Sequence, residues 1–228
     1  LLGIQLISIP GVEADDVIGT LADQATEKNL DTVISTGDKD MTQLVSKNVK
    51  VVNTMSGELL DKKGVTKKFG VPPSLIVDYL ALIGDTSDNV PGVEKVGPKT
   101  AVKWLTEYSD LEGVVKNAES IGGKVGEYLR AGLEQLSLSK DLVTIKRDVH
   151  LDVTIEGLAV QAPDKKSLEE IYKKLEFNSW LNEKTSTPVK IEPKVKSNYE
   201  LVLTEKELDK WVSKGLKAET LAIDTETT

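Results

Sequence analysis

One stretch, residues 84–101, reads GDTSDNVPGVEKVGPKTA and combines two signals. Asp85 and Asp88 are three residues apart, so a helical turn would place both carboxylates on one face. The hairpin that follows runs from Gly92 to Gly97 and leads to Pro98, at the first position of an expected helix. Glycines let backbone N–H groups approach a phosphate, and a helix N-terminus adds favourable partial charge. The stretch therefore predicts a phosphate-binding hairpin that follows a pair of carboxylates, Asp85 and Asp88.

Three lysines, Lys95, Lys99 and Lys103, flank this hairpin. In the simpler interpretation they are solvated side chains of an ordinary helical hairpin. The position directly after GDTSDN favours a role in phosphate binding instead.

Two earlier clusters add acidic side chains. GVEADD, residues 11–16, contributes Glu13, Asp15 and Asp16 near the start of an expected helix. STGDKD, residues 35–40, contributes Asp38 and Asp40, whose alternate spacing could present both to one site on an extended backbone. The simpler interpretation is helix capping and solvated strand ends, since acids gain about 0.3–1 kcal/mol at a helix N-terminus.

Together the three clusters hold seven carboxylates. Two of them a few ångströms apart repel by roughly 4 kcal/mol at an effective dielectric near 20, so gathering several requires a cation. Hard divalent ions with oxygen ligands meet that need, and a pair of Mg²⁺ or Mn²⁺ ions is the usual device for cutting phosphodiesters. The candidate metal-binding and catalytic residues are Glu13, Asp15, Asp16, Asp38, Asp40, Asp85 and Asp88.

The first half of the chain has an α/β pattern. Ile4–Ile9, Thr32–Ser35 and Val49–Asn53 are expected strands, separated by a helix from about Glu13 and a helical Met41–Val45. This succession predicts an α/β fold with a doubly wound, mainly parallel sheet. In such sheets the site lies at the carboxyl ends of the strands, where GVEADD and STGDKD fall.

From Pro72 onward the pattern is helical. The expected helices are Pro73–Ile83, Pro98–Tyr108, a segment near Leu111–Asn117, Gly126–Leu136, Ser139–Lys146 and Lys165–Leu175.

Glu183–Asn198 has two prolines and no periodicity, which predicts a linker. The last thirty residues read strand, helix, strand, at Tyr199–Leu203, Glu205–Ser213 and Thr220–Asp224. We expect the start of a second α/β domain, and ends that are cut, since the chain opens with Leu1.

Composition limits the class of protein. The chain has 228 residues, 39% apolar and 29% charged, and lacks a transmembrane-length apolar run. The absence of cysteine excludes disulfides and thiolate zinc sites. Residues 1–90 hold 8 basic and 13 acidic side chains within a net charge of −8. Bound cations would offset that local deficit, so the acidic balance does not exclude DNA as a partner.

In this order, GVEADD, STGDKD and GDTSDNVPGVEKVGPKTA resemble the 5′ nuclease domain of the bacterial DNA polymerase I family, within the flap endonuclease superfamily. The resemblance runs from about residue 1 to 182. LAIDTET, residues 221–227, resembles the first motif of the 3′–5′ proofreading exonuclease that follows in the same polypeptides. The domains expected are therefore residues 1–182, a 5′ nuclease lacking its N-terminal part, a linker at 183–198, and a truncated proofreading domain at 199–228.

The resemblance implies metal-binding roles for the seven carboxylates and for Asp224 and Glu226. It also implies a helix–hairpin–helix-like element that binds duplex backbone, with K⁺ as a further cation. The residues implied to bind DNA are Gly92, Val93, Lys95, Val96, Gly97, Lys99 and Thr100. The implied protein is a cytoplasmic, nucleoid-associated bacterial monomer that acts on duplex DNA with a 5′ end or flap, without a membrane partner.

Two other functions stay open at this stage. One is a DNA-binding module that does not cut, and the other is an acidic-site phosphatase or phosphotransferase of doubly wound fold. His150 is the only histidine and is expected at the surface. Trp104, Trp180 and Trp211 are expected in the core rather than as base-stacking platforms.

Overall fold

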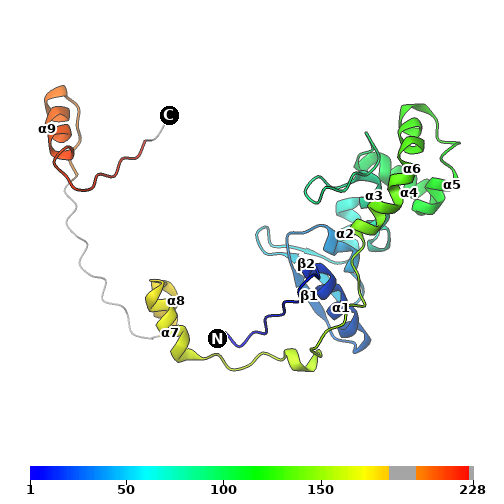
Figure 1. Cartoon of the computed structure of the whole chain (residues 1–228), viewed down its shortest axis with the longest axis horizontal. Helices are drawn as coiled ribbons and strands as arrows, with labels where there is room; N and C mark the ends of the chain where they lie inside the picture. Colours follow the sequence, from blue (N-terminus) through cyan, green and yellow to red (C-terminus); the bar gives the residue numbers. More distant parts are fainter. Residues whose placement is uncertain (185–198, 226–228) are drawn as a thin grey trace. The chain divides into compact units, whose positions relative to one another are not determined.

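The computed structural model describes residues 1–184 and 199–225. The chain divides into two units, residues 1–164 and 165–228 (Figure 1). Each is described below by itself. The expected linker at 183–198 lies outside the described residues from position 185 onward.

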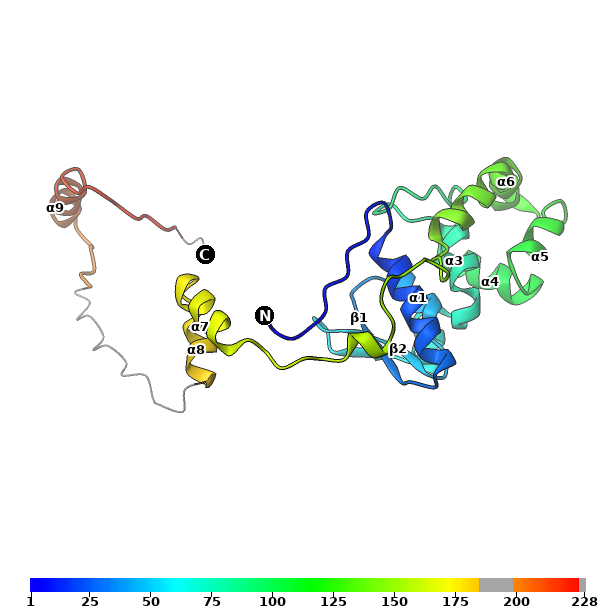
Figure 2. The ribbon, with the colours of Figure 1, turned by 60° about the horizontal axis from the view of Figure 1, so that its bottom comes forward.

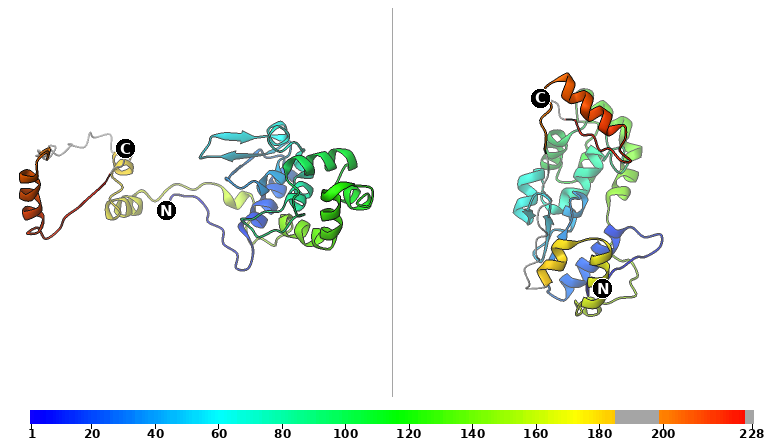
Figure 3. Two further views of the ribbon diagram at one scale, coloured as in Figure 1. Left: turned by 90° about the horizontal axis from the view of Figure 1, so that it is seen from above. Right: turned by 90° about the vertical axis from the view of Figure 1, so that its left-hand side faces the viewer.

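The first unit contains a three-stranded sheet in the order β1-β2-β3. β1 (Thr32–Ser35) pairs in parallel with β2 (Val49–Asn53), and β3 (Glu58–Leu60) pairs antiparallel with β2. Helix α1 (Ala14–Glu27) precedes β1 and lies beside it (Figure 2). The α/β class and the parallel pairing of the two expected strands are confirmed, whereas β3 was not predicted. The β2–β3 hairpin extends away from the helices (Figure 3, left).

The expected strand Ile4–Ile9 is wrong for this structure. The segment forms no strand, and Ile4 and Leu6 are 70% and 89% exposed. A strand requires a ladder partner, and the backbone contacts near this segment are single bonds from Gln161 N–H to Gly3 and from Asp164 N–H to Leu1. Apolar alternation alone therefore predicted an element that has no neighbouring strand among the described residues.

The rest of the first unit is helical. Its elements after the sheet are α2 (Lys62–Phe69), η2 (Pro73–Leu75), α3 (Ile76–Ile83), α4 (Pro98–Tyr108), α5 (Leu111–Lys116), α6 (Gly123–Val143) and the 3₁₀ turn η3 (Glu156–Leu158). Two expected helices, Gly126–Leu136 and Ser139–Lys146, are one helix, α6. Leu136, Ser139 and Val143 are buried at helical spacing, and the two serines in this part of the helix do not interrupt it.

One buried carboxylate joins three of these helices. Asp78 on α3 is 7% exposed and accepts a 3.0 Å hydrogen bond from Leu111 N–H at the start of α5. Its other oxygen lies 2.9 Å from the Lys140 ammonium on α6. Trp104 on α4 is 3% exposed, as expected for a core residue. The helices around the 84–101 stretch are thus joined by a buried carboxylate, paired with a lysine whose side chain is 47% exposed, as well as by apolar packing.

In the second unit α7 (Lys165–Lys174) packs against α8 (Asn178–Lys184), and α9 (Glu205–Gly215) follows after the gap in the described residues. Trp180 is 52% exposed and lies edge-on to Tyr172, at 5.3 Å between centroids. Trp211 is half-buried and donates a hydrogen bond to Glu200. Both expected core positions are therefore wrong, because this small unit has little apolar mass to cover them.

The expected strands Tyr199–Leu203 and Thr220–Asp224 do not form. Leu201 and Ile223 are 78% and 79% exposed, and the described residues provide them with no strand to pair with. Across residues 1–184 and 199–225, none of the helices combines the length and apolar character needed to cross a bilayer.

We expect Asp78→Ala to destabilise the first unit by about 3 kcal/mol, because it leaves Lys140 and the Leu111 N–H without their shared acceptor. Asp78→Asn keeps one acceptor and should cost about half as much. Urea denaturation measures both. The exposed cap mutation Asp110→Ala, which removes a single bond to Gly113 N–H, is the control at about 1 kcal/mol. Equal values for all three variants would contradict the buried three-helix link.

Candidate functional site

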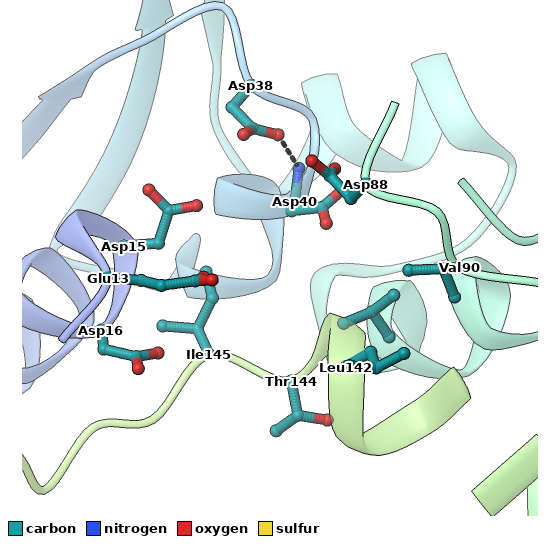
Figure 4. Close-up of a pocket in the computed structure, with 11 residues that line it drawn as sticks. Glu13, Asp15, Asp16, Asp38, Asp40, Asp88, Val90, Leu142, Thr144 and Ile145 are labelled. Atoms are coloured by element: carbon teal, nitrogen blue, oxygen red, sulfur yellow. Dashed lines mark hydrogen bonds between the residues drawn. The ribbon is translucent and has the colours of Figure 1, made fainter. Parts of the chain in front are cut away.

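Six of the seven predicted carboxylates line one cavity of about 150 Å³ (Figure 4). α1 precedes β1 in an α/β arrangement, so the start of α1 lies near the carboxyl end of β1. That end continues into the turn before the 3₁₀ helix η1 (Asp40–Leu44). The remaining wall is mainly apolar and comes from Val90 and the end of α6. The lining residues are Glu13, Asp15, Asp16, Asp38, Asp40, Asp88, Val90, Leu142, Val143, Thr144 and Ile145.

The seventh carboxylate, Asp85, lies within reach of this group. Asp40, Asp85 and Asp88 each offer an oxygen, and these oxygens lie within 4.8 Å of one another. Asp85 is buried, Asp40 is half-buried and Asp88 is exposed. The structure therefore brings all three sequence clusters together, although long segments of chain separate them.

The expected helical turn at Asp85 and Asp88 is wrong, because the backbone there is a tight loop. Asp85 and Val90 exchange two backbone hydrogen bonds of 3.0 and 2.7 Å, and the Asp85 carboxylate accepts a third from Ser87 N–H. The loop can close because Gly84 and Gly92 pack backbone to backbone. A Cβ on Gly92 would lie 2.4 Å from Gly84 N, which no side chain tolerates.

Gln43 holds the apolar wall of the cavity against the acidic turn. This buried amide donates to the carbonyls of Asp40 and Val143 at 3.0 and 2.9 Å, and accepts from Ile145 N–H at 3.1 Å. Two of these bonds, with Val143 and Ile145, join η1 to the end of α6 and the segment after it, about a hundred residues later. Gln43 belongs to no motif that was recognised in the sequence, and its side chain stands between Thr42 and Leu44 without a local signal of its role.

Asp16 and Thr20 on α1 bind the same segment. Asp16 accepts from Lys146 N–H at 2.9 Å, and the Thr20 hydroxyl accepts from Val149 N–H at 3.1 Å. Asp16 is therefore partly engaged by the backbone. Glu13, by contrast, occupies the N-cap of α1 without any capping hydrogen bond from its side chain, so the simple capping interpretation does not account for it.

Burial and neighbouring negative charges raise the pKa values of two carboxylates in the cavity, Asp15 and Asp40. Burial, followed by the charges of Asp38 and Glu13, raises the pKa of Asp15. Burial together with Asp38 and Asp85 raises the pKa of Asp40 to about 7. Asp85 is the exception, because a hydrogen bond from the Lys39 ammonium lowers its pKa. The Lys39 Nζ lies 2.5 Å from Asp85 Oδ2.

The donor set fits a hard divalent cation. Asp40 Oδ1 is buried and has no hydrogen-bond partner in the described part of the chain, although a buried carboxylate oxygen ordinarily has one. It lies among further carboxylate oxygens, the ligand type that Mg²⁺ and Mn²⁺ prefer. A cation bound there would satisfy Asp40 and offset the repulsion in one step.

The hairpin after the acidic loop has the expected form. Gly97 is the N-cap of α4 and its carbonyl accepts from Thr100 and Ala101 N–H, with Pro98 in the first turn. Lys95 and Lys99 are exposed, whereas Val93 and Val96 are buried and anchor the hairpin to the core. The N–H groups of both valines already donate, to the carbonyls of Leu82 and Val93, so these residues hold the hairpin in place.

Three other residues were singled out in the sequence, namely His150, Asp224 and Glu226. His150 is at the surface as expected, with its side chain 93% exposed beside Asp152. Asp224 is exposed and accepts a hydrogen bond from Thr225 N–H rather than ending a strand. Glu226 lies outside the described residues.

Comparison with known families accounts for this arrangement. Residues 1–70 match the family described as "5'-3' exonuclease, N-terminal resolvase-like domain", and residues 71–166 match "5'-3' exonuclease, C-terminal SAM fold". The chain belongs to the 5′–3′ exonuclease family.

Two curated relatives of this exonuclease chain differ in length. DNA polymerase I of Pseudomonas aeruginosa is 43% identical over all of this chain, which spans 27% of that protein. A 5'-3' exonuclease of Aquifex aeolicus is 45% identical over 80% of this chain, which spans 62% of it. The chain thus matches part of each relative's length.

Solved structures share the exonuclease fold. A mutant of the T5 5'-exonuclease has a TM-score of 0.57 at 22% identity, covering 60% of this chain and 57% of its own. The catalytic core of Rad2, solved in complex with a DNA substrate, has a TM-score of 0.50 at 18% identity over 80% of this chain and 63% of its own. The α/β layer followed by a helical region is the fold of both.

We expect the Asp40 carboxyl to make the metal-free exonuclease lose stability as the pH rises from about 4 to about 7. The folded protein holds the Asp40 proton up to about pH 7, whereas the unfolded chain releases it near 3.8. Asp40→Asn should remove much of this loss and stabilise the protein at pH 8 by about 1–2 kcal/mol, after allowance for solvent screening at a half-buried group.

Thermal unfolding at several pH values with a metal chelator measures the effect. Asp31→Asn, at an exposed position between α1 and β1, is the matched control and should leave the pH dependence unchanged. A pH profile of Asp40→Asn that parallels the unmodified protein would contradict the assignment.

Proposed function

We propose that this chain is a metal-dependent 5′ nuclease that hydrolyses DNA phosphodiesters near a 5′ end or flap, as part of a bacterial DNA polymerase I. One observation carries the proposal. Carboxylates from three separate segments meet in one cavity, and three of them come within 4.8 Å. Membership of the exonuclease family supports the same conclusion.

The proposed roles follow from position. Asp40, Asp85 and Asp88 would hold one cation, and Glu13, Asp15, Asp16 and Asp38 would hold or position a second. Bound Mg²⁺ or Mn²⁺ would polarise the phosphodiester and activate water. The half-buried cavity limits water around the reacting group, while the exposed Asp88 side leaves an entry for the strand. Solved T5 structures with zinc or other metal ions support a divalent cation here.

The hairpin at Gly92–Thr100 would hold the duplex. Lys95 and Lys99 are exposed on the element that directly follows the acidic loop in the chain, where they would bind phosphates of the same DNA molecule. Backbone N–H groups and lysines read no bases, which suits a nuclease that recognises structure rather than sequence. The T5 flap endonuclease and the Rad2 core have been solved with DNA, which supports a DNA partner. The resemblance adds K⁺ as the cation of this hairpin.

We propose the domain limits 1–182, 183–198 and 199–228. The Aquifex exonuclease matches 80% of the chain and the Pseudomonas polymerase matches all of it, which supports a nuclease followed by the start of another domain. In the whole protein, Asp224 and Glu226 would bind metal for 3′–5′ proofreading. The protein would act as a monomer in the bacterial cytoplasm, at the nucleoid.

A second candidate is a duplex-binding module that does not cut. The exposed Ile4–Ile9 segment favours it, since an unpaired apolar segment leads directly into the Glu13 cluster. Metal binding without cleavage, together with intact DNA binding, would identify this alternative.

We expect Asp85→Asn/Asp88→Asn to weaken Mn²⁺ binding at least about tenfold, because loss of even an outer-shell partner costs that much at metal sites. Calorimetric titration of the 228-residue chain measures binding, and release of a 5′ nucleotide from a labelled flap measures cleavage. Asp152→Asn, whose side chain is 97% exposed, is the control. Unchanged Mn²⁺ isotherms in the double variant would remove the metal assignment.

Lys95→Ala/Lys99→Ala should weaken duplex binding similarly for all sequences. If each lysine contacts one phosphate, the slope of log affinity against log salt should fall by up to about 1.8. Fluorescence anisotropy across a salt series measures this. The control variant is Lys47→Ala/Lys50→Ala, which removes the same two charges and should keep the slope. Lys47 lies just before β2, and Lys50 is within it. A slope retained in the hairpin variant would indicate solvated lysines.

A further inference from the structure

Lys39 occupies an unusual place in the acidic cluster. It lies between Asp38 and Asp40 in the sequence, yet its ammonium pairs with a carboxylate from a different segment, with Nζ 2.5 Å from Asp85 Oδ2. The Asp85 side chain is 5% exposed, whereas that of Lys39 is 39% exposed. The lysine therefore reaches from the solvent edge to the most buried carboxylate of the triad.

Both oxygens of Asp85 are engaged in this arrangement. Oδ1 accepts from Ser87 N–H at 2.8 Å, and Oδ2 holds the Lys39 ammonium. A divalent cation shared by Asp40, Asp85 and Asp88 would need an oxygen of Asp85 within about 2.0–2.6 Å. Each carboxylate oxygen has a second lone pair, but an ammonium and a metal ion at such distances repel each other, so a bound metal ion weakens the hold of Oδ2 on Lys39.

We infer that Lys39 is an exchangeable counter-ion of the metal centre: it neutralises Asp85 while the centre is metal-free and leaves when a divalent ion binds. The inference rests on the proposed function, since it assumes that the triad binds metal. It assigns a specific task to a residue that the acidic motif itself does not single out.

The exchange is physically accessible. Lysine carries a compact charge on a flexible four-carbon stem, and Lys39 is already partly in solvent, so its head can move outward without disturbing η1. Asp85 is held in place independently, by Ser87 N–H and by the two backbone bonds to Val90. The carboxylate therefore stays oriented towards the cluster after the lysine departs.

This competition predicts that removing the Lys39 charge has opposite effects on Mn²⁺ affinity and on the stability of the metal-free protein. Without the Lys39 charge, metal no longer displaces a cation, so Mn²⁺ should bind more tightly. The metal-free protein should become less stable, because a buried carboxylate has lost its partner. A lysine with a purely structural role would weaken both properties or neither, and a lysine that only contacts DNA would leave Mn²⁺ affinity unchanged.

The test is calorimetric titration of Mn²⁺ into the 228-residue chain and its Lys39→Gln variant, with thermal unfolding of both in chelator. We expect about tenfold tighter Mn²⁺ binding in the variant, on the scale of a lost neighbouring charge, and a lower melting temperature without metal. Lys39→Arg, which keeps the charge, should retain the affinity of the unmodified protein. Lys68→Gln is the matched control, because Lys68 forms a comparable 2.6 Å pair with Glu58 where both side chains are more than 40% exposed.

The possible results distinguish failure of the counter-ion inference from failure of the proposed function. Equal or weaker Mn²⁺ binding by Lys39→Gln, beside normal binding by the unmodified chain, overturns the counter-ion inference alone. Failure of the unmodified chain to bind Mn²⁺ overturns the proposed function and this inference together. Tighter binding in the Lys68→Gln control would also overturn it, since the gain would then follow from net charge rather than from position.

Discussion

Repulsion among carboxylates is the constraint on which the rest of this structure depends. Six acidic side chains line one cavity of about 150 Å³, and a seventh is buried beside it. Pairs of such charges cost roughly 4 kcal/mol at an effective dielectric near 20. The protein accommodates them by three means: a raised pKa at Asp40, backbone hydrogen bonds to Asp16 and Asp85, and an ammonium from Lys39. These arrangements offset the repulsion while the carboxylates stay close together.

Holding the clusters together requires rigid links between distant segments. Gln43 joins the acidic turn to the end of α6, and Asp78 joins α3 to α5 and α6. Gly84 and Gly92 allow the Asp85 loop to close on itself. Because each link uses buried hydrogen bonds or backbone contact, the geometry of the cavity is built into the fold of the first unit rather than left to mobile side chains.

The proposed DNA-binding hairpin directly follows the Asp85 loop in the chain. The Asp85 loop leads through Gly92 into the hairpin, and the buried Val93 and Val96 fix it to the core. A phosphate held at Lys95 or Lys99 would therefore have a defined distance to the carboxylates. In a nuclease that reads no bases, a fixed distance between the phosphate-binding hairpin and the carboxylate cavity would determine where the strand is cut.

The sequence by itself determined the local features: the three acidic clusters, helices α1, α3 and α4, strands β1 and β2, and the hairpin capped by Gly97 and Pro98. These depend on neighbouring residues, through periodicity, capping and turn chemistry. Only the tertiary structure decided which elements persist and what meets in space. Ile4–Ile9 has strand-like alternation but no partner among the described residues, α6 continues through its two serines, and Asp85 lies in a loop rather than a helix. The contact of Lys39 with Asp85 and the Gln43 link join residues far apart in the chain, and such contacts are set by packing, which no local pattern encodes.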